Sequence, residues 1–130
     1  MKLFKYFIIG FLIVGFSNNM WSQGSVKNID SATLNTVLTK NPNIQLIDVR
    51  TSNEFNSGHL KKAINLNYYD KSFSQQISKL DKSKPIYVYC RSGVRSKYSA
   101  TILKKLGFKT VYNLKGGILS WNKLKLPLEK

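Results

Sequence analysis

The stretch Pro85-Ile-Tyr-Val-Tyr-Cys90-Arg-Ser-Gly-Val-Arg-Ser96 decides the fold, because it predicts a buried strand, a loop and the start of a helix. Four β-formers follow Pro85, whose missing N–H is harmless at the first position of a strand. Apolar residues at helical spacing continue to Leu106, and Gly107 ends the helix. Cys90 therefore lies at the carboxyl end of a strand, where open parallel α/β sheets bind ligands.

The rest of the chain repeats this alternation of strand and helix. We expect strands at 26–29, 44–49, 63–66, 86–89 and 110–114. Helices are expected from Asp30 or Ser31 to Thr39 and at 52–57, 73–80 and 118–124, besides the helix that follows Cys90. Such an alternation predicts an α/β fold, a parallel sheet covered by helices on both faces. At 130 residues the chain has room for one domain.

The loop after Cys90 has the composition of an anion-binding site. Gly93 permits a positive φ, so that successive N–H groups can point inward, and the free amides of the next helix add its positive dipole end. Arg91 and Arg95 add guanidinium charge. Such surroundings lower the pKa of a thiol from about 8.5, so we expect Cys90 to be a thiolate nucleophile beside a bound oxyanion.

The other loop residues are expected to help through their backbone. Ser92 and Ser96 are interpreted as sources of loop and helix-cap hydrogen bonds, and the amides from Arg91 to Arg95, that of Val94 included, as the main anion donors. Arg91 and Arg95 are interpreted as anion-binding side chains, the alternative being solvated surface charge.

Several motifs together resemble the single-domain members of the rhodanese-like sulfurtransferases. They are Leu46-Ile-Asp-Val-Arg50, Glu54-Phe55, Gly58-His-Leu60, Ala63-Ile-Asn-Leu66, the Cys90 loop, Gly107-Phe108, Val111 to Leu114, Gly116-Gly117 and Trp121. Their order and spacing cover roughly residues 27 to 126. The joint signal is specific, whereas any one of these pieces alone is weak.

The resemblance implies a three-layer α/β/α rhodanese-like fold with about five strands and a two-step sulfur transfer. The Cys90 thiolate attacks the sulfane sulfur of a small anionic donor such as thiosulfate, giving a persulfide and sulfite. A nucleophilic acceptor, cyanide or a thiol, then removes the sulfur, which is covalent catalysis. No cofactor and no metal ion are expected.

Two alternatives stay open. Cysteine-dependent phosphatases and arsenate reductases separate their cysteine from an arginine by five residues, whereas four separate Cys90 from Arg95 here and Ser96 occupies the later position. The other alternative is a non-catalytic rhodanese-like module that binds an anion or senses sulfur.

Outside the loop, structural roles are expected for most polar residues. Asp48, Arg50 and Glu54 are interpreted as an ion-paired or hydrogen-bonded support at a strand end, with a supporting role for Asp48 or Arg50 in the site left open. His59, the lone histidine, is interpreted as structural or surface-exposed, because no orienting residue for a catalytic pair is recognisable.

The N-terminus predicts export. Lys2 and Lys5 precede the apolar run Phe7 to Phe16, which is short for a membrane span but typical of a signal peptide. We expect a signal peptide at 1–22 and a rhodanese-like domain at 23–130, with cleavage after Ser17 or a retained anchor as alternatives. The expected location is the periplasm, and no stable membrane span is expected after cleavage. An unpaired cysteine in an oxidising compartment indicates a reactive thiol.

The charge of the chain favours small anions as partners. Removing Lys2 and Lys5 lowers the 21 basic residues to 19, and with 6 acidic residues the formal net charge stays at +13. A basic field speeds the encounter with anions such as thiosulfate. Nucleic acid is not expected as a partner, because an exported protein is separated from the nucleic acids of the cell. The sequence also has no motif that combines basic and aromatic residues for nucleic-acid binding. Affinity for anionic lipid head groups stays open.

Overall fold

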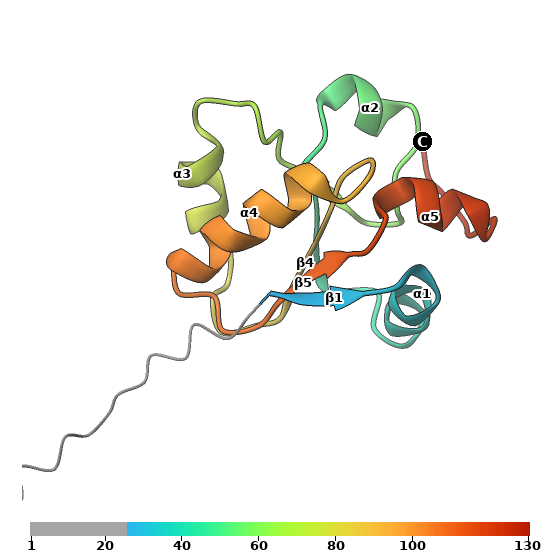
Figure 1. The fold of residues 1–130 in the computed structure, drawn as a ribbon, viewed down its shortest axis with the longest axis horizontal. Helices are drawn as coiled ribbons and strands as arrows, with labels where there is room; N and C mark the ends of the chain where they lie inside the picture. The colour runs from blue at the N-terminus through green and yellow to red at the C-terminus, as the bar shows by residue number, and fades with distance from the viewer. Residues whose placement is uncertain (1–25) are drawn as a thin grey trace, which may run out of the picture.

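The sheet has five parallel strands in the order β1-β5-β4-β2-β3. A computed structural model describes residues 26–130 (Figure 1). Every pairing between neighbouring strands is parallel. The strands are β1 Lys27–Ile29, β2 Gln45–Asp48, β3 Ile64–Asn65, β4 Ile86–Tyr89 and β5 Val111–Leu114. The α/β class, the parallel sheet and its five strands are thus confirmed.

Helices follow the strands as the sequence predicted. They are α1 Ser31–Lys40, α2 Ser52–Asn56, α3 Phe73–Ser78, α4 Val94–Lys105 and α5 Gly117–Lys123. Each strand or helix for which bounds were given lies within two residues of them at either end. These differences fall where terminal residues leave the regular hydrogen-bond pattern for the connecting loops.

Two apolar clusters pack on opposite faces of the sheet. Ile86 and Val88 of β4 join one cluster with side chains from α3 and α4, and Cys90 continues this face. Tyr87 and Tyr89 join the other cluster, with side chains from α1 and α5. Helices α4 and α1 accordingly lie on opposite sides of the strands in Figure 1. This three-layer arrangement places Cys90 at the carboxyl edge of a fully covered central strand.

The predicted signal peptide, residues 1–22, and both predicted cleavage sites lie outside the described residues. Within residues 26–130, none of the helices combines the length and the apolar character needed to cross a membrane.

Truncating the core of α4 tests this packing. Leu103 is 1% exposed, so the substitution Leu103→Ala should lower the free energy of unfolding by about 2–5 kcal/mol. Tyr98 lies on the same helix but is 59% exposed, so Tyr98→Ala should change it by about 0.5 kcal/mol or less. Urea unfolding followed by circular dichroism measures both. Equal losses would contradict the placement of α4.

Candidate active site

The loop between β4 and α4 turns sharply at Gly93. This residue has a φ of 101°, in the left-handed region that favours glycine, and it stands directly before the first residue of α4. The Asn113 side-chain amide, from β5, donates to the Gly93 carbonyl at 3.3 Å. The predicted positive φ at Gly93 is therefore confirmed, and a neighbouring strand holds the turn in place.

The start of α5 holds the other end of the loop. The N–H of Ile118 donates to the Cys90 carbonyl at 2.9 Å, and the N–H of Leu119 donates to the Arg91 carbonyl at 3.1 Å. In a trans peptide the C=O and the following N–H point in opposite directions. Fixing the Arg91 carbonyl toward α5 therefore turns the Ser92 N–H the other way, toward the thiol.

Glycine is required where α5 meets the loop. Gly117 has a φ of 58°, and a Cβ built on it would collide with the backbone of Cys90 and Arg91. Its lack of a side chain lets α5 approach closely enough to donate to both carbonyls.

Hydrogen bonds stabilise the thiolate of Cys90. The N–H of Gly93 lies 3.1 Å from Sγ, and the Ser96 hydroxyl lies 3.4 Å from it. Burial alone raises the pKa of the Cys90 thiol, but donation from the Ser96 side chain and from the backbones of Ser96, Gly93 and Ser92 outweighs it. The net pKa is lowered, the direction that a sulfur nucleophile needs.

The reactive sulfur lies deep in the loop. Cys90 is 1% exposed, and it is a free thiol. Beside the loop opens a cavity of about 310 Å³, whose lining includes Arg91, Glu54 and Leu119. The sulfur is thus shielded from bulk solvent, and the adjoining cavity lies beside the loop that holds it.

Arg95 is bound by an ion pair that the sequence analysis did not predict. Its guanidinium makes two hydrogen bonds to Glu54, at 2.7 and 2.9 Å, and lies 5.7 Å from the centre of the Tyr69 ring. The hydrogen bonds from Arg95 lower the pKa of Glu54 from 4.5 to about 2. Glu54 was interpreted, with Asp48 and Arg50, as part of an ion-paired or hydrogen-bonded support at a strand end. Its ion-pair partner is Arg95 of the loop, so Arg91 is the loop guanidinium without such a carboxylate partner among the described residues.

Asp48 and Arg50 form a buried ion pair at 2.7 Å, at the carboxyl end of β2. Arg50 also donates to the Gly58 carbonyl at 2.7 Å. Burial lowers the pKa of Arg50, but the hydrogen bonds to Asp48 together with the attraction of nearby negative charge, that of Asp48 first, outweigh this, and the net pKa is raised. Val49, which lies between them, donates its N–H to the Tyr89 carbonyl. The ion pair of Asp48 and Arg50 therefore stabilises the strand end next to Cys90.

His59 packs into the fold away from the hydrogen bonds around the thiol. Its ring stacks on Phe55 with a centroid distance of 3.8 Å, and its Nδ1 lies 2.9 Å from the Leu60 carbonyl oxygen. Its backbone pairs with Glu129. These contacts match the structural role expected for this residue.

The structure brings together Cys90, Ser92, Gly93 and Ser96 around one sulfur, while Arg91 and Val94 are exposed at the rim. The sequence analysis missed the contacts that Asn113 and α5 make with the loop. Gly116-Gly117 directly after a strand was the available signal, since two glycines at a sheet edge indicate a close backbone approach. Among residues 26–130 there is no group of three or more His, Cys, Asp or Glu side chains that could hold a metal ion.

The comparison with protein families identifies the family of this chain. The model of the rhodanese-like domain matches residues 32–124, and the chain belongs to this family. A sulfurtransferase of Allochromatium vinosum is 33% identical over 79% of this chain and 94% of its own. The thiosulfate sulfurtransferase GlpE of Shewanella oneidensis is 35% identical over 65% of this chain and 82% of its own.

Other relatives match this chain over a smaller part of their own length. The tRNA uridine(34) hydroxylase of Pelagibacter ubique is 39% identical over 60% of this chain, which spans 26% of that enzyme. Protein YqhL of Bacillus subtilis is 43% identical over 59% of this chain and 60% of its own.

Solved structures confirm the rhodanese-like fold. The rhodanese-like domain of the Anabaena protein Alr3790 superposes with a TM-score of 0.70 and 29% identity, covering 81% of this chain and 80% of that one. The polysulfide-sulfur transferase of Wolinella succinogenes gives a TM-score of 0.67 and 29% identity, covering 80% and 78%.

The substitution Gly117→Ala should raise the pKa of the Cys90 thiol, because α5 must move away and release the two loop carbonyls. Gly107→Ala is the matched control, since Gly107 also has a positive φ, 98°, but a Cβ there meets no atom within 4 Å. The ultraviolet absorbance of the thiolate, followed against pH, measures the change. A rise in both variants, or in neither, would refute the role assigned to α5.

The ion pair between Glu54 and Arg95 predicts a pH-dependent stability. Because the pKa of folded Glu54 is about 2 and its ordinary value is 4.5, the stabilisation is complete at neutral pH and is lost as pH falls through this range. We expect Glu54→Gln to cost about 1–2 kcal/mol at pH 7, allowing for partial exposure of the pair, and much less near pH 2.

Glutamine can still accept the hydrogen bond from Thr51 in the helix cap. The difference in free energy of unfolding between the variant and the unsubstituted protein therefore measures the effect of the negative charge. Glu129→Gln serves as the control, because the half-buried carboxylate of Glu129 has no ion-pair partner within residues 26–130 and accepts only from the Lys62 N–H; its substitution should lower the free energy of unfolding less at pH 7. Urea unfolding at several pH values measures both variants, and a constant cost for Glu54→Gln would contradict the ion-pair explanation.

Proposed function

We propose that this protein transfers a sulfane sulfur from a small anionic donor, thiosulfate or a related compound, to a nucleophilic acceptor through a persulfide on Cys90. The observation that carries the proposal is the single buried thiol whose pKa is lowered by the surrounding loop donors. Membership of the rhodanese-like family and the sulfurtransferases among its relatives support it.

In the first step the Cys90 thiolate attacks the outer sulfur of thiosulfate. A bond forms between Sγ and that sulfur, the bond to the sulfite sulfur breaks, and its electron pair leaves with sulfite. The product is a Cys90 persulfide, whose negative outer sulfur can take over the N–H donors of the loop. No proton moves, because the nucleophile is already ionised and sulfite leaves as an anion.

In the second step the acceptor attacks the outer sulfur of the persulfide. A bond forms between the acceptor and the outer sulfur, and the bond between that sulfur and Sγ breaks, with its electron pair returning to Sγ. Cyanide is thereby converted to thiocyanate, and a thiolate to a new persulfide. The thiolate of Cys90 is regenerated, so that the two half-reactions balance without an external oxidant or reductant.

The loop residues have different proposed roles. The N–H groups of Ser92 and Gly93 and the hydroxyl of Ser96 hold negative charge on sulfur. Arg91, exposed at the rim, attracts the anionic donor. Arg95, bound by Glu54, positions the loop. Asp48 and Arg50 support the strand end from behind, without touching the reacting atoms.

The loop fits a single sulfur atom better than a phosphoryl ester. The reacting thiol is 1% exposed, and the position at which the phosphatases carry arginine is Ser96, whose hydroxyl points to the thiol. A tetrahedral phosphoryl group needs donors around three outer oxygens. Ser96 instead directs a hydrogen bond to the nucleophile itself.

We further propose that the protein acts after export, in a periplasm. Lys2, Lys5 and the apolar run Phe7 to Phe16 support this. Expression of the full chain, followed by cell fractionation and N-terminal sequencing, tests it. A new N-terminus near Gln23 in the periplasmic fraction is the expected result, and an intact Met1 in the cytosol would overturn it.

Incubation of the reduced protein with thiosulfate tests the chemistry. Intact mass spectrometry should show one added sulfur atom that a thiol reductant removes, and sulfite should appear in equal amount. Addition of cyanide should remove the added sulfur as thiocyanate. The variant Cys90→Ser should show neither the adduct nor the turnover.

The other outcomes each identify a rival function. A folded protein with a reduced thiol that gains no sulfur from thiosulfate or polysulfide would be a binding module. Hydrolysis of p-nitrophenyl phosphate that Cys90→Ser abolishes would indicate a phosphatase. Either result would overturn the proposal.

A further inference from the structure

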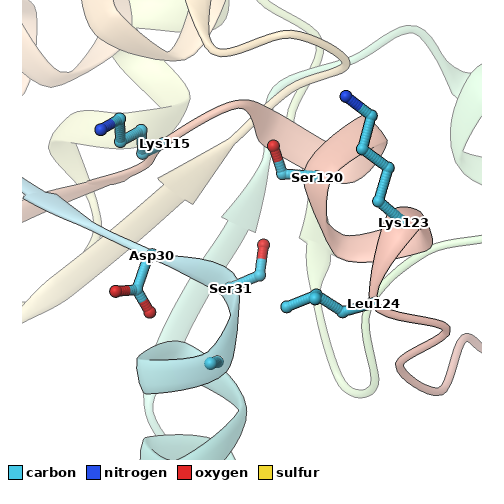
Figure 2. A pocket seen from close by; sticks show the side chains of 7 residues that line it. Asp30, Ser31, Lys115, Ser120, Lys123 and Leu124 are labelled. Carbon is cyan, nitrogen blue, oxygen red and sulfur yellow. The ribbon is translucent and has the colours of Figure 1, made fainter.

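A second cavity lies at the carboxyl edge of the sheet, between the start of α1 and helix α5 (Figure 2). Its volume is about 330 Å³, and none of its lining residues belongs to the loop 90–96. The walls come from the first residues of α1, from Lys115 at the end of β5 and from one side of α5. The mechanism at Cys90 makes no use of this space.

Ser31 contributes a polar group without a partner to this cavity. The residue is 3% exposed, and its hydroxyl oxygen has no hydrogen-bond partner within residues 26–130. Figure 2 shows the hydroxyl pointing from the first turn of α1 toward α5. Since buried polar groups are nearly always paired, this one indicates a ligand that supplies the missing acceptor or donor.

The start of α1 adds backbone donors. The Asp30 carboxylate caps the helix by accepting from the Thr33 N–H at 2.8 Å. The first N–H groups of a helix have no intrahelical acceptor. The Asp30 cap accepts from the Thr33 N–H, so the N–H groups of Ser31 and Ala32 stay available to a ligand. Figure 2 shows the Asp30 carboxylate turned away from the space that Ser31 faces. The helix N-terminus therefore offers the cavity an anion-binding end.

The charged side chains around the cavity also favour an anion. Lys115 and Lys123 line it, against the single carboxylate of Asp30. Figure 2 shows the Lys115 ammonium pointing away from the two hydroxyls, and the long flexible stems of both lysines allow them to turn over the cavity. Ser120 adds a second hydroxyl, while Leu124 adds an apolar wall.

We propose that this cavity binds the phosphate group of a small phosphorylated molecule. The backbone N–H groups of the first turn of α1, the hydroxyls of Ser31 and Ser120 and the two ammonium groups supply donors for the phosphate oxygens. Leu124 packs against the organic part of the ligand.

Nuclear magnetic resonance of the ¹⁵N-labelled full chain tests the site with two probes, inorganic phosphate and phenyl phosphate. Both are titrated at constant ionic strength against chloride. We expect saturable shifts of the Ser31, Ala32 and Ser120 amides. Phenyl phosphate should bind more tightly if the apolar wall takes part, whereas equal affinity would assign the site to free phosphate.

The variant Ser31→Ala separates a ligand-binding role from a structural one. It removes a buried hydroxyl that has no partner in the free protein, so the melting temperature without phosphate should stay equal or rise. Affinity for phosphate should fall about tenfold, the typical effect of losing a hydrogen bond to a charged group. The double variant Lys115→Gln/Lys123→Gln should also weaken binding, whereas Lys97→Gln/Lys104→Gln, which changes α4 equally in charge, should not.

Several results would overturn the proposal. Shifts confined to the amides of the loop 90–96 would mean that phosphate binds only beside Cys90. Phosphate binding would depend on net charge alone if Ser31→Ala left the affinity for phosphate unchanged. The same conclusion would follow if the two lysine double variants lowered that affinity equally. Sulfur transfer by Cys90 is measured separately, so these outcomes leave the proposed function untouched.

Discussion

The donation of two N–H groups from the start of α5 to the carbonyls of Cys90 and Arg91 is the constraint on which the site depends. Because each peptide unit is planar and trans, anchoring these carbonyls orients the N–H groups that follow them. Helix α5 thereby satisfies two of its own free donors and turns the Ser92 N–H toward the sulfur. The same contact is possible only because Gly117 has no side chain.

Burial and hydrogen bonding act on the Cys90 sulfur in opposite directions. A thiol that is 1% exposed is expected to resist ionisation, and here the donors from Ser96, Gly93 and Ser92 reverse this tendency. The result is a thiol that ionises more readily than an ordinary cysteine and is at the same time shielded from solvent. A buried thiolate of this kind favours reactions in which one atom is transferred and the leaving group remains outside.

Much of the fold was predictable from the sequence, because strand and helix periodicities are local. The β4 pattern, the positive φ at Gly93 and the parallel sheet follow from residues near one another in the chain. The partner of Arg95 was not predictable in this way. Glu54 lies 41 residues earlier, and its contact with Arg95 depends on how α2 packs over the loop. The role of Ser31 was not predictable either. In the sequence it is an ordinary residue at the start of a helix, and the cavity that it lines forms only when α5 packs opposite α1.

The main chain and the side chains of the loop 90–96 have different roles. Backbone amides, with Ser96, set the ionisation of the sulfur, whereas the side chains of Arg91, Ser92 and Val94 are exposed. Substitutions at these three exposed positions can therefore change which molecules approach without changing the reactivity of the sulfur. A scaffold with this separation can acquire new specificities through single substitutions while its chemistry is inherited intact.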